Sequence, residues 1–241
     1  MNNLNRSTRR LGPEYQVRVK GGNLRQWMAL FAGSIREAEG RLTELDAAIG
    51  DADHGVNMRR GMDAVEEKLG QLSLTDLSGQ TRVISTTLLS SVGGASGPLY
   101  GAFFLQFSHS TVHQAELGLA ELTSAIEAGY KGVVQLGKAA VGDKTMVDTL
   151  AAVVQSLRAS CNHHEALPQA LEACAKAGRA AAEGTIPMVA RKGRASYLGE
   201  RSAGVQDPGA TSAALLFDSL ALAVTPISSQ LQVQLQNPIL L

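Results

Sequence analysis

The chain has 241 residues, with 22 basic and 22 acidic side chains and a formal net charge of zero. The length is sufficient to bury a sizeable core, and the zero charge gives no long-range attraction to nucleic acid or to an acidic membrane surface. No apolar run approaches the length of a membrane span. We therefore expect a cytoplasmic protein, without nucleic-acid or membrane partners, that recognises a small ligand or another protein.

Apolar residues recur at helical spacing along most of the chain. Within residues 23–42, Leu24, Trp27, Phe31 and Ile35 are three or four positions apart, as on one face of an amphipathic helix. The same rhythm predicts helices from Val56 onward and over residues 83–92, 102–107, 117–126, 146–157, 166–182 and 210–224. Strand-like alternation is scarce, so the predicted fold is all-α, with about seven to nine helices in a bundle or barrel.

The sequence indicates one domain with an extension at each end. No Pro/Ser-rich linker or charge run divides the middle of the chain. Residues 1–21 are basic and polar, and residues 225–241 form an alternating tail that we expect to be mobile. Cys161 and Cys174 are the only cysteines and lie in no ligand cluster, so we expect buried or unreactive reduced thiols.

The segment LDAAIGDADHGVNM, residues 45–58, concentrates acidic side chains. It sets Asp46, Asp51 and Asp53 within twelve positions that also include His54 and Asn57. Short carboxylates that converge without a nearby thiol suit magnesium, which relieves their mutual repulsion. Offsets of five and two residues do not stack on one helical face, so we expect the ligands on a loop. The helix predicted to follow gives that loop an anion-binding N-terminus.

Two other interpretations of this segment remain to be weighed. An acidic turn with glycines is also typical of a solvated loop or a helix cap. A calcium loop of the EF-hand type is excluded, because counting from Asp51 it requires glycine at position six and glutamate at position twelve, where this chain has Val56 and Met62.

Three further loops have compositions suited to a nucleotide. The small residues of Gly93-Gly94-Ala95-Ser96-Gly97 let backbone amides approach an anion, although the same loop also suits a flexible linker. Arg194 and Arg201 suit either a polyphosphate or a surface ion pair. Residues 207–211, DPGAT, read locally as a turn that begins a helix.

We expect no function for two apparent motifs. Residues 132–138, GVVQLGK, match a phosphate-binding P-loop except that Ala139 replaces the hydroxyl residue, and no predicted strand precedes them. His109 and His113 are four apart, as zinc ligands on a helix are, but they have no acidic partner, so we expect surface histidines.

Five motifs together resemble the nucleotide-binding L subunit of dihydroxyacetone kinase, the DhaL family. They are LDAAIGDADHGVNM, GGASGPLYG, GDKTMVDTL, RASYLGERS and QDPGATS, and they agree with that family in order and spacing. The resemblance covers residues 22–224, which it implies form a DhaL nucleotide-binding domain. It implies a barrel of eight antiparallel helices with ADP or ATP and two magnesium ions at one end.

The resemblance also implies roles for individual residues. Asp46, Asp51 and Asp53 would ligate the two magnesium ions, and Arg194 would neutralise phosphate during catalysis. The remaining cofactor-binding positions would hold the phosphates or line the nucleoside pocket: His54, Gly55, Asn57, Ala95, Ser96, Gly137, Met146, Asp207, Pro208 and Gly209.

The family divides the kinase between subunits. A separate K subunit binds dihydroxyacetone covalently through a histidine, so the resemblance implies that this chain, a phosphotransferase subunit, docks its nucleotide end on K. Its bound ADP would be recharged by a subunit of the phosphotransferase system, and we expect a homodimer. The alternatives are an ATP-exchanging kinase for another small ketose or a fatty acid, or a regulatory module that senses nucleotide state.

Overall fold

The structure, a computed structural model, describes residues 17–73 and 76–224. The predicted tail at 225–241 and most of the predicted extension at 1–21 lie outside the described residues. Within them the chain forms eight α-helices and a 3-10 helix, η2, and the all-α prediction is confirmed. The elements are α1 (Gly21–Ile49), α2 (His54–Gln71), α3 (Leu77–Ser91), α4 (Ser96–Ser110), α5 (Leu119–Gly137), α6 (Met146–Asn162), α7 (Leu167–Gly184), η2 (Arg194–Ser202) and α8 (Pro208–Val224).

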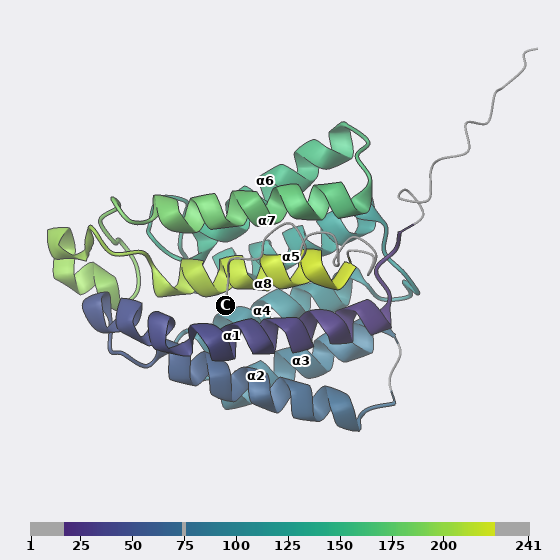
Figure 1. Cartoon of the computed structure of the whole chain (residues 1–241), viewed down its shortest axis with the longest axis horizontal. Coiled ribbons are helices and arrows are strands. Elements are labelled where there is room, and N and C mark those ends of the chain that lie inside the picture. The colour runs from purple at the N-terminus through teal and green to yellow at the C-terminus, as the bar shows by residue number, and fades with distance from the viewer. Residues whose placement is uncertain (1–16, 74–75, 225–241) are drawn as a thin grey trace, which may run out of the picture.

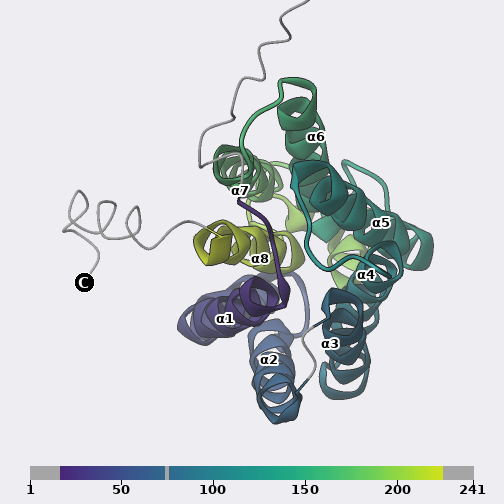
Figure 2. The ribbon, with the colours of Figure 1, turned by 90° about the vertical axis from the view of Figure 1, so that its right-hand side faces the viewer.

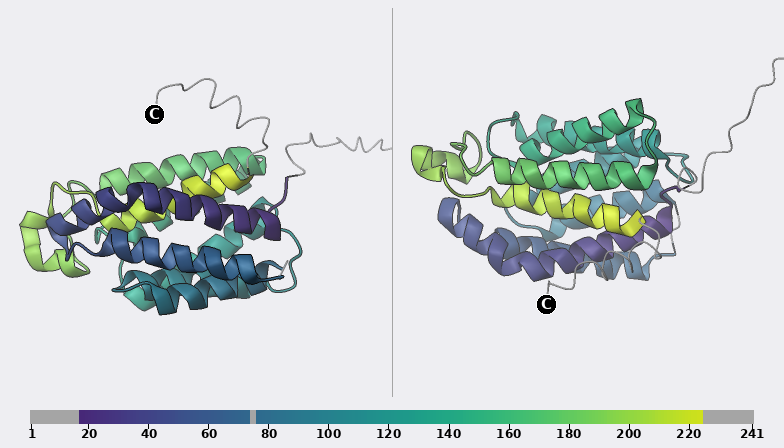
Figure 3. Two further views of the ribbon diagram at one scale, coloured as in Figure 1. Left: turned by 60° about the horizontal axis from the view of Figure 1, so that its bottom comes forward. Right: turned by 45° about the horizontal axis from the view of Figure 1, so that its top comes forward.

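The helices form a ring of neighbours. Each α-helix packs against the next one in sequence, and α8 packs against both α7 and α1. Figure 2 shows this arrangement along the helix axes, with α8 between α7 and α1. Because short turns connect most of the helices, the direction alternates, and α2, α4, α6 and α8 all begin at one end of the molecule. The α1–α2 turn and η2 lie together at that end (Figures 1 and 3).

Aromatic side chains hold α1, α4 and α8 together. Trp27 is fully buried, and its ring centroid lies 5.9 Å from that of Phe104 and 6.1 Å from that of Phe107. The indole N–H donates to the carbonyl of Leu216 at 2.7 Å, which satisfies its one polar group. Phe103 meets Phe217 edge to face. Burial of each such side chain contributes about 1.5–3 kcal/mol to the stability of the fold. This aromatic cluster therefore stabilises the ring of helices from whose ends the loops extend.

The first described residues are attached to the opposite end of the ring. Val19 is buried and exchanges backbone hydrogen bonds of 2.9 Å with Leu117. Lys20 forms an exposed ion pair of 3.3 Å with Glu116. Residues 17–20 thus pack against the α4–α5 connection, although composition groups them with the polar extension.

Away from the acidic segment, the predictions for the histidine pair and for the apparent P-loop are confirmed. Cys161 and Cys174 are free thiols, and burial raises the pKa of Cys174 to about 12. His109 and His113 are exposed, and residues 132–137 of the apparent P-loop lie in α5. Among the described helices, none combines the length and apolar character needed to cross a membrane.

Candidate nucleotide and metal site

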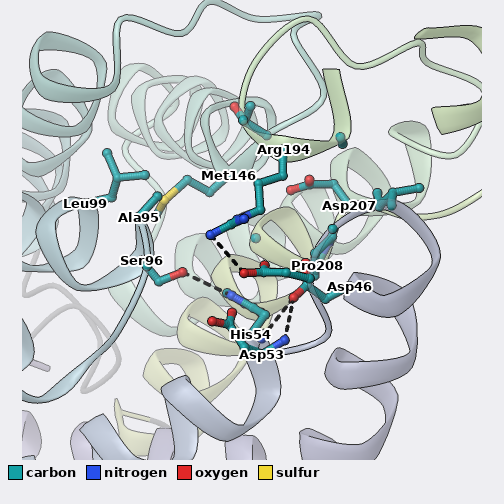
Figure 4. A pocket seen from close by; sticks show the side chains of 18 of the residues that line it. Asp46, Asp53, His54, Ala95, Ser96, Leu99, Met146, Arg194, Asp207 and Pro208 are labelled. Carbon is teal, nitrogen blue, oxygen red and sulfur yellow. Dashed lines mark hydrogen bonds and ion pairs between the residues drawn. The ribbon is translucent and has the colours of Figure 1, made fainter. Parts of the chain in front are cut away.

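A pocket of about 180 Å³ opens where four helices begin. The first residues of α2, α4, α6 and α8 all line it, namely His54, Ser96, Met146 and Pro208. Figure 4 shows their side chains gathered around one space. The unpaired backbone N–H groups and dipoles of helix N-termini favour negative charge, so this convergence suits an anionic ligand such as a phosphate chain.

Three carboxylates meet at one side of this pocket. One oxygen each from Asp46, Asp51 and Asp53 lies within 4.8 Å of the other two. Asp46 is nearly buried, and its Oδ2 accepts hydrogen bonds from the amides of Asp53, at 2.8 Å, and of His54, at 3.1 Å. These bonds fix one carboxylate and fold the turn around it. The donor set is all carboxylate oxygen, with no thiol, and therefore fits Mg²⁺.

The prediction that all three acids lie on a loop is wrong for Asp46. This residue lies in the last turn of α1, which runs to Ile49 and ends at Gly50. The helix continues past Leu42 because Leu45 and Ile49 keep burying apolar side chains at helical spacing. Asp51 and Asp53 lie in the α1–α2 turn as expected. The site therefore joins one carboxylate on a helix to two on a short turn.

Arg194 reaches this cluster from a distant part of the sequence. It is the first residue of η2, and its guanidinium forms an ion pair of 2.9 Å with Asp51. The Arg194 side chain is 66% exposed and extends from η2 toward the acidic side chains, as Figure 4 shows. The sequence left two roles open for Arg194, an ion pair or a contact with polyphosphate. The structure is compatible with both, because Arg194 pairs with Asp51 and also lines the pocket in which a phosphate chain would fit. Arg201 does not line the pocket.

A chain of hydrogen bonds runs inward from Ser96. Its hydroxyl lies 3.1 Å from Nδ1 of His54, whose Nε2 lies 2.9 Å from the hydroxyl of Ser212. The buried Tyr100 hydroxyl is 2.8 Å from the same Ser212 oxygen. Burial lowers the pKa of His54, although the neighbouring carboxylates act in the opposite direction. The neutral ring donates at one nitrogen and accepts at the other, so these hydroxyls orient it.

Asp207 directly precedes α8 and also lines the pocket. Its carboxylate accepts a hydrogen bond of 2.6 Å from the amide of Ala210, and its own amide donates to the Thr185 hydroxyl at 2.9 Å. Burial raises the pKa of this carboxyl group to about 7, against the opposing effects of the Ala210 bond and the charge of Lys144. Asp207 is thus an anchored helix cap whose charge is costly in the metal-free protein.

The structure places most, but not all, of the predicted site residues in the pocket. Outside the lining are Gly55, Asn57 and Gly137. Gly55 lies where a Cβ would approach the Glu39 carbonyl oxygen to 2.2 Å, so it permits close packing of α2 on α1. Asn57 is nearly buried behind the Gly93–Gly94 loop and accepts a hydrogen bond from Arg60. Gly137 adjoins Leu99, which does line the pocket.

Other lining residues were not singled out from the sequence. They share positions inside or beside the recognised motifs, and they include Ile49, Leu99, Tyr100, Lys144, Thr145 and Lys192. Ser212 closes the QDPGATS motif and enters the hydrogen-bond chain without lining the pocket. Their positions in or beside the motifs were the only sequence feature that could have predicted a place in the pocket. Their side chains are apolar or ordinary polar groups, which gave no chemical reason to select them.

The fold and the site define a class of helical domain that presents carboxylates beside converging helix N-termini, and comparison with known proteins identifies its family. A DAK2 domain matches residues 48–222. The chain is 52% identical over 182 residues, 76% of this chain and 87% of the relative, to the PEP-dependent dihydroxyacetone kinase ADP-binding subunit DhaL of Escherichia coli K12. It is 41% identical over 195 residues, 81% of this chain and 92% of the relative, to a Listeria innocua protein described as PEP-dependent dihydroxyacetone kinase 1, ADP-binding subunit DhaL. The chain therefore belongs to the DAK2 family, among the DhaL subunits of dihydroxyacetone kinases, which are phosphotransferases.

A solved structure is also similar. The dihydroxyacetone kinase of C. freundii in complex with AMP-PNP and Mg²⁺ matches with a TM-score of 0.65 and 27% sequence identity. The match covers 83% of this chain and 33% of that chain, so the present chain spans about a third of the solved kinase. The family assignment predicted from the five motifs is confirmed.

Proposed function

We propose that this chain is the nucleotide-binding half of a split kinase. It binds ADP or ATP with two Mg²⁺ ions and transfers the γ-phosphoryl group to dihydroxyacetone held by a separate K subunit. The observation that carries this proposal is the three-carboxylate cluster placed beside four helix N-termini in one pocket. The names of the bacterial relatives and the Mg²⁺ and AMP-PNP complex of the solved kinase support the choice of ligands.

Each side of the pocket has a separate task in this proposal. Asp46, Asp51 and Asp53 hold the metal ions, which supply positive charge to the phosphate oxygens. His54 and Ser96, with the backbone at Ala95, receive the phosphates at the starts of α2 and α4. Gly55 and Asn57 support that surface from behind.

The other side of the pocket accommodates the nucleoside. Met146 and residues 207–209 line it, with Gly137 behind Leu99. Arg194 exchanges its contact with Asp51 for the γ-phosphoryl group and stabilises the charge of the transition state. In this arrangement positioning and electrostatics, rather than covalent chemistry of the chain, perform the catalysis.

Exposed apolar side chains at the pocket end suit a protein partner. Tyr197 in η2 is 88% exposed, and Val141, Leu136 and Val56 are also exposed on segments at this end. Exposed apolar side chains that gather on one part of a surface are typical of protein interaction sites. We assign this end to the K subunit, because transfer requires the nucleotide and the ketose to share one water-excluding space.

The phosphoryl donor is proposed from the relatives. Bacterial relatives are described as PEP-dependent or PTS-dependent, including one from Lactococcus lactis at 40% identity over 81% of this chain. We therefore propose that a phosphotransferase-system subunit recharges ADP in place, in a cytoplasmic complex. A homodimer and a domain spanning residues 22–224 remain part of the proposal, and sedimentation velocity and limited proteolysis test them.

The proposal is tested by denaturing the purified protein and analysing what it releases. Stoichiometric ADP and magnesium that survive gel filtration support a retained coenzyme recharged in place. Protein that binds ATP weakly and reversibly supports an ATP-exchanging kinase instead. The absence of any nucleotide binding in the presence of Mg²⁺ overturns the proposal.

A further inference from the structure

Lys144 is a buried cation in the GDKTMVDTL motif for which nucleotide binding has so far supplied no role. It is 1% exposed and lies just before Thr145, the N-cap of α6. Its ammonium group donates to the backbone carbonyls of Thr185 at 2.7 Å and Val205 at 2.5 Å, with Ile186 at 3.4 Å. An ammonium group has three hydrogens, so these three acceptors account for all of its donors.

These bonds join three segments that are distant in sequence. Thr185 follows α7, Val205 follows η2, and Lys144 itself precedes α6. Backbone bonds extend the junction, since the amide of Arg191 donates to the carbonyl of Asp143 at 3.1 Å. The amide of Gly204 donates to the carbonyl of Ile186 at 2.7 Å. The Lys144 ammonium thus lies at the junction of three hydrogen-bonded loops, residues 142–145, 185–191 and 203–207.

The same three segments carry one side of the pocket. Met146 follows the first, Arg194 follows the second, and Asp207 ends the third. The carboxylate cluster, His54 and Ser96 come instead from α1, the α1–α2 turn, α2 and α4. The pocket therefore has a metal side and a nucleoside side built from different helices, and Lys144 bonds only within the nucleoside side.

We propose that Lys144 is a positioning residue for the nucleotide: its side chain borders the pocket, but its ammonium group acts through the three loops of the nucleoside side, because all of its hydrogens are donated to their backbone carbonyls. This inference rests on the proposed function. Loss of the ammonium group leaves buried carbonyls without their donor, and each buried unsatisfied group favours an altered loop arrangement. The metal side shares none of the Lys144 bonds and meets the nucleoside side through the ion pair of Arg194 with Asp51.

The test separates nucleotide binding from metal binding in Lys144→Met, which keeps the length of the side chain but removes its charge and donors. ADP affinity is measured by calorimetry with saturating Mg²⁺, and metal affinity by Mn²⁺ titration without nucleotide. We expect ADP to bind at least tenfold more weakly, whereas Mn²⁺ affinity changes by no more than about fivefold, which is the most that loss of the exposed Arg194–Asp51 ion pair causes. Lys176→Met, on the exposed face of α7, is the matched control and keeps both affinities.

Chemical rescue keeps the inference testable if Lys144→Met folds poorly. In Lys144→Ala, propylammonium replaces the missing part of the side chain and is expected to restore ADP affinity, whereas 1-propanol is not. Wild-type ADP affinity in Lys144→Met, or equal rescue by both additives, overturns the role of Lys144. Because wild-type protein is measured in parallel, its failure to bind ADP refutes the proposed function separately.

Discussion

Asp53→Asn is the cleanest perturbation of the carboxylate cluster. The Asp53 side chain makes no capping hydrogen bond at the start of α2, whereas Asp46 accepts two backbone amides and Asp51 pairs with Arg194. The substitution therefore removes one negative charge and preserves the shape of the side chain. Its effect isolates the electrostatics of the cluster from its hydrogen bonding.

The magnitude follows from the separation of the carboxylates. At the 4.8 Å that bounds the cluster, two unit charges repel by about 0.9 kcal/mol at water-like permittivity and about 3.5 kcal/mol at an effective value of 20. Asp53 is partly exposed, so the lower figure applies, and its two pairs together cost about 2 kcal/mol. Loss of a negative charge at a helix N-terminus returns about 0.5 kcal/mol of this.

Asp53→Asn therefore stabilises the metal-free protein by about 1.5 kcal/mol, which raises Tm by about 3–6 °C for a chain of this size. In the presence of Mg²⁺ we expect the substitution to have the opposite effect on stability. At a concentration 100 times its Kd it stabilises the wild type by about 2.7 kcal/mol, and this gain is largely lost when one ligand is removed. The variant is thus more stable than the wild type without metal and gains little stability when metal is added.

Thermal unfolding followed by circular dichroism, in EDTA and then in excess Mg²⁺, measures both effects. Glu172→Gln removes an exposed charge from α7, away from the cluster, and serves as the control. If Asp53→Asn in EDTA has a lower Tm than the control variant, repulsion between the carboxylates does not destabilise the metal-free protein. A wild-type response of the variant to Mg²⁺ refutes the assignment of Asp53 as a ligand.

Three further predictions concern other parts of the site. Arg194→Ala weakens ADP binding at least tenfold, measured by calorimetry, and unchanged ADP affinity contradicts the phosphate role. Metal affinity without nucleotide rises by up to about fivefold, because Asp51 loses an exposed ion pair worth at most about 1 kcal/mol. The pKa of Asp207, raised by burial to about 7 from an ordinary 3.8, means that the folded state binds the proton more tightly. Stability of the metal-free protein therefore falls as pH rises from 5 to 7, by about 2 kcal/mol relative to Asp207→Asn in urea titrations, and parallel profiles exclude this linkage. Gly55→Ala places a methyl group within 2.2 Å of an α1 carbonyl oxygen and lowers stability by about 1–3 kcal/mol in the same titrations. The control Gly40→Ala lies in open space on α1 and raises stability by up to about 1 kcal/mol, so equal effects of the two substitutions refute the packing argument.

The sequence determined the helices and the chemistry of the acidic segment. Apolar side chains repeat every three or four residues because one face of each helix must be buried, so the pattern identifies the helices without knowledge of their partners. Three short carboxylates among twelve residues indicate a cation for the same local reason. Even so, α1 extends to Ile49, beyond the predicted end at residue 42, because its last apolar positions pack against segments that local periodicity did not reveal.

Tertiary structure alone decided what these local features face. Arg194 lies 143 positions after Asp51, and Ser212 lies 158 positions after His54, yet both pairs are in contact. Lys144 has the composition of a surface residue and is buried because carbonyls from two other loops converge on it. Spacing along the chain reports on one helix or one turn, whereas contacts between loops depend on how the ring of helices closes, and that is set by the packing of all the helices together.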